Sequence, residues 1–171
     1  LLTIQRCNCL LFVHDQTRFP VFIPALTKPD LANIDWCFED VLMNTLLKCN
    51  ATEKQRITAA ALLQPLAFVG GTDRSVLGTL NRTAQDIEHS IYFDSLDVAE
   101  LTGYSLSAWM AQRPCMVKNS KDFIMPGKAF LAMLDDLHPG KKPAGRKKAE
   151  QEPLPDNVVM LDLFRDDNEE Q

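Results

Sequence analysis

Residues 9–26, "CLLFVHDQTRFPVFIPAL", decide the fold class of this chain. Two runs of aliphatic and aromatic side chains flank the polar residues 15–17, a pattern typical of two strands joined by a hairpin turn. Residues 1–5, "LLTIQ", predict another strand in front, with residues 6–8 as its turn. Pro20 has no backbone N–H for a neighbouring strand, so we expect it at a sheet edge or facing away from its neighbour. The front of the chain therefore predicts an antiparallel β-meander.

Helical patterns follow the meander. Asp35 is predicted to cap a helix over residues 36–49. Thr52 and Gln55 have the spacing of a capping box, which predicts a helix over residues 53–64. A short strand, "LAFV", is expected directly afterwards at residues 66–69.

The second half of the chain mixes the same elements. We expect one long helix within residues 72–93, short helices on either side of Gly103, and a small hairpin formed by residues 115–125. Pro126 suits the first turn of a last helix. The sequence thus predicts one α+β domain over residues 1–137, in which a small antiparallel β-meander packs against several helices on one face.

Residues 138–171 differ in composition. They are rich in proline, glycine and charge, which predicts a disordered tail because too little apolar surface is available to offset the entropy of ordering. The tail is basic at 141–148 and acidic at its end. One apolar segment, "VVMLDLF" at 158–164, interrupts it. This segment could bind a partner's sheet edge or groove, or dock on its own domain, and the sequence leaves these alternatives open.

Composition excludes several functional classes. The chain has 171 residues, is 46% hydrophobic and 24% charged, and carries a net charge of −5, so no global positive field attracts nucleic acid or an anionic membrane. Its apolar runs are too short to cross a bilayer. Five cysteines, an odd number, with no signal peptide before them predict reduced thiols and a cytoplasmic location. The start on Leu1 leads us to expect a missing N-terminal segment.

Residues 72–93 carry the candidate site. A buried stripe is predicted on one side of this helix, and a polar stripe runs beside it. Gly78 belongs to the polar stripe, although a glycine inside a helix costs roughly 1 kcal/mol relative to alanine. Either a ligand or partner approaches Gly78, or the glycine permits tight packing of the helix on the meander. The candidate binding residues are Asp73, Arg74, Ser75, Gly78, Asn81 and Gln85.

No motif predicts a metal or a cofactor. Cys7 and Cys9 lack the second pair of ligands that structural zinc needs. Ser75 is not in a nucleophile-elbow sequence, and Gly70-Gly71 belongs to neither common phosphate-binding glycine motif. Asp86 and His89 are better explained as a solvated pair on the helix surface.

Two motifs resemble a known family. "CLLFVHDQTRFPVFIPAL" and the later "DRSVLGTLNR" are similar to the hairpin "LFVN-x-x-T" and the helix "NRSVxGSMND" of the uncharacterised bacterial proteins in domain-of-unknown-function family 6933. The resemblance covers roughly residues 1–135, with departures at His14, Asp73 and Arg82. It implies a bacterial, cytosolic protein and gives weight to the Arg74–Asn81 face, but it implies no activity. The matching residues are Leu11, Phe12, Val13, Thr17, Arg74, Ser75, Val76, Gly78 and Asn81.

Three functions follow from these patterns. A non-enzymatic protein-interaction or ligand-binding module is favoured, because no catalytic constellation stands out. The alternative is a small hydrolase or nucleic-acid-processing enzyme with a polar cleft around Arg74 and Asn81, helped by Asp73 or His89. Such an enzyme should bring His14, Asp15 or Arg18 close to Arg74. Nucleic-acid binding is expected only through the basic segment 141–148.

Overall fold

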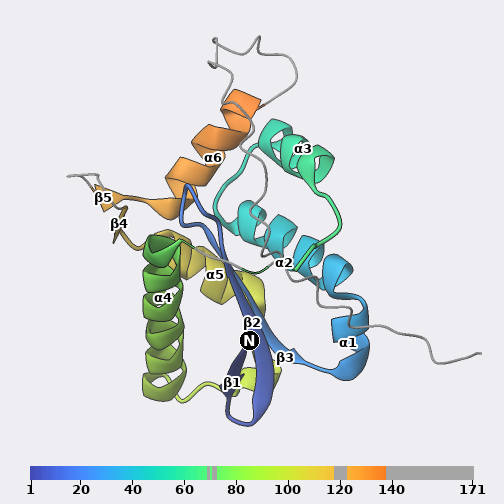
Figure 1. Cartoon of the computed structure of the whole chain (residues 1–171), viewed down its shortest axis with the longest axis vertical. Coiled ribbons are helices and arrows are strands. Elements are labelled where there is room, and N and C mark those ends of the chain that lie inside the picture. Colours follow the sequence, from blue (N-terminus) through green and yellow to red (C-terminus); the bar gives the residue numbers. More distant parts are fainter. Residues whose placement is uncertain (69, 71–72, 118–122, 138–171) are drawn as a thin grey trace, which may run out of the picture.

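The computed structural model describes residues 1–68, 70, 73–117 and 123–137. Within them, a three-stranded sheet lies among helices, and a separate two-stranded hairpin lies beside the top of the longest helix (Figure 1). The α+β class predicted from the sequence is confirmed. The tail predicted at 138–171 lies outside the described residues.

The sheet is the expected antiparallel meander. Its strands are β1 (Leu2–Ile4), β2 (Cys7–Val13) and β3 (Pro20–Leu26), in the order β1-β2-β3. The first turn falls on Gln5 and Arg6 rather than on residues 6–8, because both have positive φ, 50° and 65°, as a tight two-residue hairpin turn requires. Pro20 is the first residue of an edge strand, as predicted, and lies opposite Val13.

Six α-helices and one 3₁₀-helix surround the sheet in the described part of the chain. Proline at the start of α6 and the short hairpin before it agree with the sequence prediction. The elements are α1 (Lys28–Ala32), α2 (Ile34–Lys48), α3 (Glu53–Leu62), α4 (Arg74–Phe93), η1 (Val98–Glu100), α5 (Gly103–Ala111), β4 (Cys115–Met116), β5 (Phe123–Ile124) and α6 (Pro126–Leu137).

Capping groups explain where two helices begin. The capping box of α3 is confirmed: Thr52 Oγ1 accepts from the Gln55 N–H at 3.3 Å, and Gln55 Oε1 accepts from the Thr52 N–H at 2.8 Å. The cap of α4 is Asp73, whose carboxylate accepts from the Ser75 N–H at 2.6 Å.

Two predictions are wrong: Asp35 is not the cap of α2, and residues 66–68 are not in a strand. The cap of α2 is Asn33, and Asp35 instead accepts a hydrogen bond from the Leu66 N–H at 2.7 Å. Residues 66–68 form no strand, since this bond holds them beside the start of α2, and Val69 lies outside the described residues.

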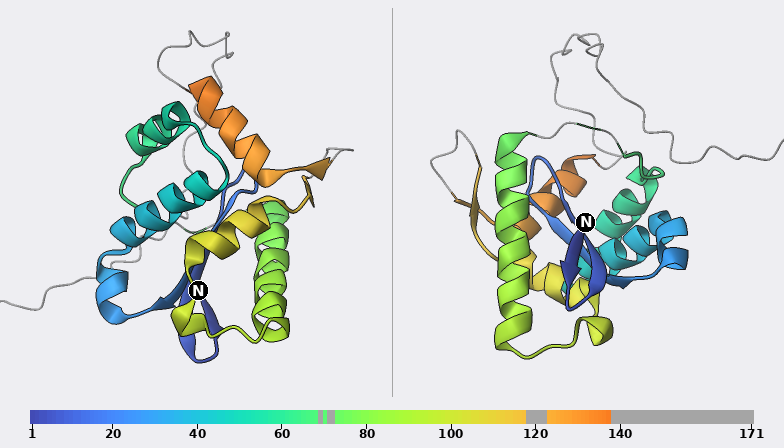
Figure 2. Two further views of the ribbon diagram at one scale, coloured as in Figure 1. Left: turned by 180° about the vertical axis from the view of Figure 1, so that it is seen from behind. Right: turned by 60° about the horizontal axis from the view of Figure 1, so that its bottom comes forward.

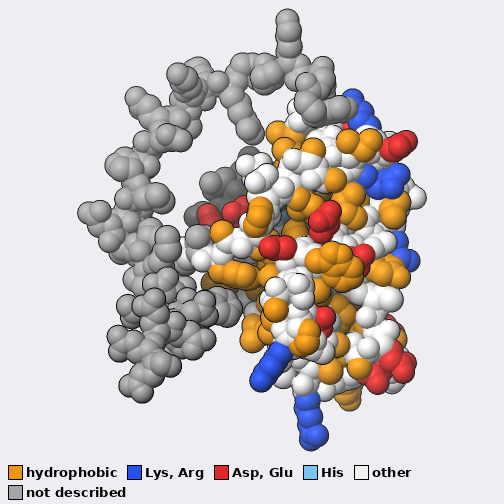
Figure 3. All heavy atoms as spheres, turned by 90° about the vertical axis from the view of Figure 1, so that its right-hand side faces the viewer, with side chains coloured by type: hydrophobic (Ala, Val, Ile, Leu, Met, Phe, Trp, Pro, Cys, Tyr) orange, Lys and Arg blue, Asp and Glu red, His pale blue; other side chains and the backbone are white. Residues whose placement is uncertain are grey.

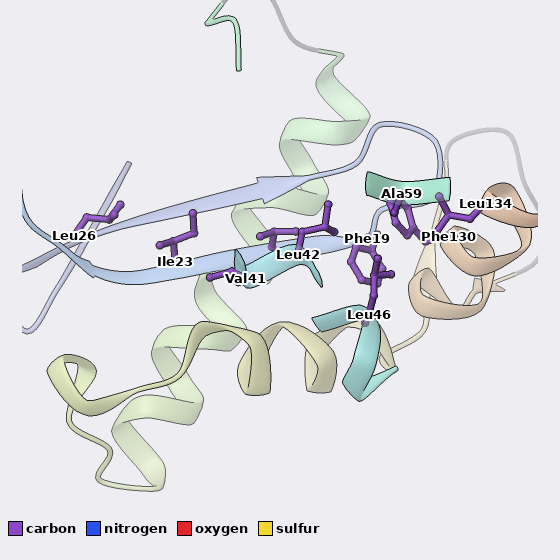
Figure 4. Packing of buried hydrophobic residues seen from close by; sticks show 11 residues of the cluster. Phe19, Ile23, Leu26, Val41, Leu42, Leu46, Ala59, Phe130 and Leu134 are labelled. Carbon is purple, nitrogen blue, oxygen red and sulfur yellow. The ribbon is translucent and has the colours of Figure 1, made fainter. Parts of the chain in front are cut away.

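Helices cover both faces of the sheet, not one face as expected. Figure 2 shows α4 on one side of the sheet and α1, α2 and α3 on the other. Successive strand residues point to opposite faces, and here both sets are apolar. Cys9, Leu11 and Phe22 pack with α4 and α5. The opposite face packs against α2, α3 and α6 (Figure 4) through Phe19, Val21, Ile23, Leu26, Leu42, Leu46, Ala59, Phe130 and Leu134.

Close contact between α5 and β3 depends on a glycine. A Cβ placed on Gly103 would collide with the carbonyl oxygen of Phe22. Ser107, one turn further along α5, accepts from the Phe22 N–H at 2.8 Å and donates to the Gly103 carbonyl at 2.7 Å. This buried hydroxyl therefore fixes α5 against an edge strand.

The face formed by α1, α2 and α3 mixes hydrophobic and charged side chains (Figure 3). Trp36 and Ile57 are among its exposed apolar residues. Across the described residues, no helix combines the length and apolar character needed to cross a membrane.

Candidate functional site

A cavity of about 550 Å³ opens where segments far apart in the sequence meet. The hairpin loop before β3, the first half of α4, the end of α5, the β4–β5 hairpin and the start of α6 all contribute to its wall (Figure 1). The hairpin loop and α4 contribute hydroxyl groups and two arginines to the wall, whereas α5, the β4–β5 hairpin and α6 contribute mostly apolar side chains.

Arg18 is the anchor of this cavity. Only 5% of its surface is exposed, and among the described residues it is the only charged side chain that is buried. Its Nη2 donates to Ser75 Oγ at 3.1 Å, whereas its Nε and Nη1 are buried and have no hydrogen-bond partner among the described residues. In the described part of the chain no carboxylate forms an ion pair with it. An uncompensated buried charge costs about 3–5 kcal/mol, so an anion beside Arg18 would stabilise the site.

The hairpin loop fixes the position of Arg18. The Arg18 N–H donates to the His14 carbonyl at 2.8 Å, and the His14 N–H donates to the Phe19 carbonyl at 2.9 Å. Arg18 has a φ of 60°, a left-handed conformation that costs a non-glycine residue roughly 1–2 kcal/mol. Strain of this kind persists where the surroundings impose it, and such residues are common at binding sites.

One face of α4 supplies hydroxyl groups to the cavity. Ser75, Thr79 and Thr83 are spaced four residues apart, so they lie along one side of the helix and line the wall beside Arg18. Gly78 lines the same wall, and no atom lies within 4 Å of a Cβ placed there. The interpretation that Gly78 permits tight packing on the meander is therefore wrong. Its missing side chain instead leaves open space at the cavity.

The charged residues of the wall are mostly basic. Among the described lining residues, Arg18, Arg82 and Arg113 are basic and Asp86 is the single carboxylate. Asp86 Oδ2 lies 3.5 Å from Arg113 Nη1, so its charge is already matched. Within a protein of net charge −5, the cavity is thus a local positive region that favours anions.

Apolar side chains close the other side. Met110 and Pro126 are buried, whereas Met116 and Phe123 are 58% and 66% exposed and stand at the mouth. A ligand that puts an anionic group beside Arg18 would therefore lie against apolar surface with its remaining atoms.

Cys115 is the nucleophilic side chain of the cavity wall. Burial raises the pKa of its thiol, and the positive charge of Arg18 only partly opposes this effect. The thiol is therefore protonated near neutral pH, which makes it a poor nucleophile.

Some of the candidate residues predicted from the sequence line the cavity, and others do not. Ser75 and Gly78 line the cavity, and Asp73 holds the Ser75 backbone at the start of α4. Arg74, Asn81 and Gln85 are exposed and lie outside the cavity wall. Their role in binding stays a prediction.

Several cavity residues escaped the sequence prediction. Gly78 has polar neighbours on both sides of the helix, and the predicted candidates included Ser75 but otherwise followed the stripe through Arg74, so Thr79, Arg82 and Thr83 were missed. The repeat of hydroxyls at every fourth position was a usable signal. Arg18 was expected near the site only under the enzyme hypothesis, and the fold brings it to Ser75 across 57 residues of sequence.

Other titratable groups lie elsewhere. His14 and Asp15 line a second hollow on the opposite side of the hairpin loop, and His89 is exposed, with its ring 6.0 Å from that of Phe93. Of the three meander residues expected near Arg74 in an enzyme, only Arg18 lies in the cavity. Across the described residues, no cluster of three or more His, Cys, Asp or Glu side chains is suited to hold a metal ion.

Comparison with known proteins identifies one family. A family model described as a domain of unknown function, DUF6933, matches residues 1–129. This match confirms the resemblance seen in the hairpin and α4 motifs. No curated protein and no solved structure matches the chain.

Proposed function

The chain belongs to the DUF6933 family, and we propose that it is a non-enzymatic binding module that holds the anionic group of a small ligand beside Arg18. The buried guanidinium with two unpartnered nitrogens carries this proposal. Arginine suits phosphate and carboxylate oxygens, because its N–H groups form charge-assisted hydrogen bonds with them.

The residues around the cavity favour binding over catalysis. A hydrolase needs a general base or an activated nucleophile in reach of the bound group. Here the Cys115 thiol is protonated and Asp86 is paired with Arg113. The groups expected to form an enzymatic cleft, Arg74 and Asn81, are exposed outside the cavity wall. Nucleic-acid binding through 141–148 concerns residues outside those described.

The size and lining of the cavity define the ligand. A volume of about 550 Å³ is in the range of small-molecule sites. Arg18 and Arg82 in the wall, together with Arg113 paired to Asp86 and with Phe123 and Met116 at the mouth, fit a small anion with an apolar or aromatic body.

Thermal unfolding of the full chain tests this function. Orthophosphate and phenyl phosphate are titrated at constant ionic strength, with sodium chloride as the balancing salt. A ligand present at about 100 times its Kd stabilises the folded state by about 2.7 kcal/mol. We expect phenyl phosphate to act at lower concentration than orthophosphate, because its ring meets the apolar wall.

Two arginine variants test whether the phosphate compounds stabilise the protein by binding in the Arg18 cavity. Arg18→Met should abolish the stabilisation, and its own melting temperature should not fall, because the substitution replaces an uncompensated buried charge by an apolar side chain. Arg74→Met, at the exposed first residue of α4 and outside the cavity wall, should respond like the wild type. An equal response in Arg18→Met would exclude the cavity as the site. Release of inorganic phosphate from phenyl phosphate would instead support the enzyme alternative.

A further inference from the structure

The β2–β3 hairpin loop borders a second hollow, here called the groove. It measures about 980 Å³ and lies between the hairpin loop, α2, α3 and α6. Its floor is buried and apolar and includes Phe19, Leu42 and Phe130. Leu62 and Leu137 stand at its rim, 49% and 41% exposed. The groove shares no lining residue with the Arg18 cavity.

The groove walls are unusual for a surface left to water. Phe12 and Phe38 pack edge to face with their ring centroids 4.9 Å apart, and both are only half-buried and line the groove. Met133 and Leu63 extend this apolar lining. Contiguous exposed apolar surface of this kind marks a place where another chain segment docks.

The position of Leu137 points to the occupant. It is the last residue of α6, it lines the groove, and residues 138–171 continue from it. Residues 138–157 can span roughly 65 Å when extended, so the apolar segment 158–164 can reach any part of the groove. Tethering over this length also gives a local concentration on the order of 1 mM, so even a weak contact is populated.

The chemistry of the tail matches the groove. Residues 158–164, "VVMLDLF", are apolar except for one aspartate and form the only such run after α6. The basic segment 141–148 precedes them, and the groove lining includes the acidic residues Asp15 and Asp136. Docking of 158–164 in the groove would bring the preceding basic residues close to Asp15 and Asp136.

We propose that residues 158–164 dock in the groove of their own chain and cover its apolar floor. The sequence left open whether this segment binds a partner or its own domain, and the groove at the end of α6 favours its own domain. This inference is independent of the function proposed for the Arg18 cavity.

Photo-crosslinking in the full-length chain tests the docking. Benzoylphenylalanine replaces Phe164, which keeps an aromatic side chain at that position. After irradiation, mass spectrometry should find crosslinks within one chain to groove residues such as Phe38, Leu63 or Met133. Crosslinks between two chains, crosslinks to other surfaces, or none at all would each overturn the inference.

A matched pair of variants provides the control. Leu62 and Leu47 are 49% and 50% exposed, and each lies in the last turn of its helix, but only Leu62 lines the groove. A carboxylate at the groove rim should oppose burial of the apolar segment, so Leu62→Glu should lower the crosslink yield by roughly tenfold. Leu47→Glu should leave it unchanged. An equal effect of both would contradict docking at this place.

A second groove variant controls for misfolding as the cause of a lower crosslink yield. Ala132 is exposed on α6 and lines the groove, so Ala132→Glu adds a charge there without emptying a packed position. It should reduce crosslinking as Leu62→Glu does while keeping the melting temperature of the wild type. Full crosslinking in Ala132→Glu would also overturn the inference.

Discussion

Arg18 and Phe19 are neighbours in the chain, yet their side chains lie on opposite sides of the β2–β3 hairpin. Arg18 lines the cavity beside α4, while the Phe19 ring stacks on Phe130 at a centroid distance of 4.4 Å and lines the groove. A residue before proline favours extended backbone, and Phe19 precedes Pro20. The stacked Phe19 thus holds the loop so that the guanidinium of Arg18 remains on the α4 side.

Two helical glycines, Gly78 and Gly103, should respond in opposite ways to alanine. No atom lies within 4 Å of a Cβ at Gly78, so Gly78→Ala should raise the free energy of unfolding by about 1 kcal/mol through helix propensity. Gly103→Ala should lower it by roughly 1–3 kcal/mol, because the new methyl group forces α5 away from the Phe22 carbonyl. Urea denaturation of both variants measures the difference. A loss of stability in Gly78→Ala would show that another part of the molecule fills that space.

Ser75 should matter more for stability than Ser90, the other serine of α4. Its hydroxyl is the hydrogen-bond partner of Arg18 Nη2, and a bond to a charged group contributes about 1.5–3 kcal/mol. Ser75→Ala should therefore destabilise the protein and weaken phosphate binding. Ser90→Ala is the control, since Ser90 is half-buried in the same helix and gains the same helix propensity from alanine. Equal free energies of unfolding for the two variants would count against the Arg18–Ser75 bond.

Stability should depend on the protonation of His14. Burial, and to a lesser degree the charge of Arg18, lowers its pKa, while Asp15 opposes the shift. The unfolded chain takes up this proton near pH 6.5 and the folded chain only at lower pH. The free energy of unfolding should therefore fall as the pH drops from about 6.5 through the lowered pKa, because the unfolded state binds more protons in that window.

A side-chain exchange tests the origin of this slope. His14 Nδ1 accepts from the Thr17 N–H at 3.2 Å, a bond that a protonated ring cannot accept. Asparagine can offer its Oδ1 at a similar place, so His14→Asn should keep the loop and remove this part of the pH dependence. His89→Asn, at an exposed position, should retain it. Urea denaturation between about pH 8 and about pH 5 gives the comparison; a slope unchanged in His14→Asn would assign it to other groups.

Local sequence patterns were enough to predict most of the elements. The meander, the capping box at Thr52 and the helix start at Pro126 depend on residues close together in the chain. The cap of α2 was missed because Asp35 bonds to Leu66, 31 residues away. The covering of both sheet faces was also missed, although the unbroken apolar run from Cys9 to Val13 is typical of a strand buried on both sides.

The site was only half predictable for a similar reason. Gly78 identified the helix and the turn that border the cavity. A glycine inside a helix needs an explanation, and tight packing does not provide one at this position. The direction in which the helix faces the cavity depends on Arg18 and on the hairpin at Cys115, and both are far from α4 in sequence. The hydroxyls repeated at every fourth position of α4 mark this face of the helix, but nothing within residues 72–93 shows that Arg18 meets it.

Cys115 tests the charge of Arg18 without any ligand. Burial raises the pKa of the thiol and Arg18 lowers it, so Arg18→Met should raise the pKa further and slow alkylation by iodoacetamide at about pH 8. Arg18→Lys keeps the charge and should react at nearly the wild-type rate. Cys49 is the internal reference, because burial alone raises its pKa, and peptide mass spectrometry follows both thiols in one sample.

The same reaction then reports on the bound anion. Phosphate beside Arg18 offsets the positive charge next to Cys115, so it should slow alkylation of Cys115 in the wild type and leave Cys49 unaffected. In Arg18→Met the added phosphate should change neither rate. If phosphate slows Cys115 equally in both proteins, the anion binds without Arg18, and the unpartnered nitrogens of its guanidinium serve some other purpose.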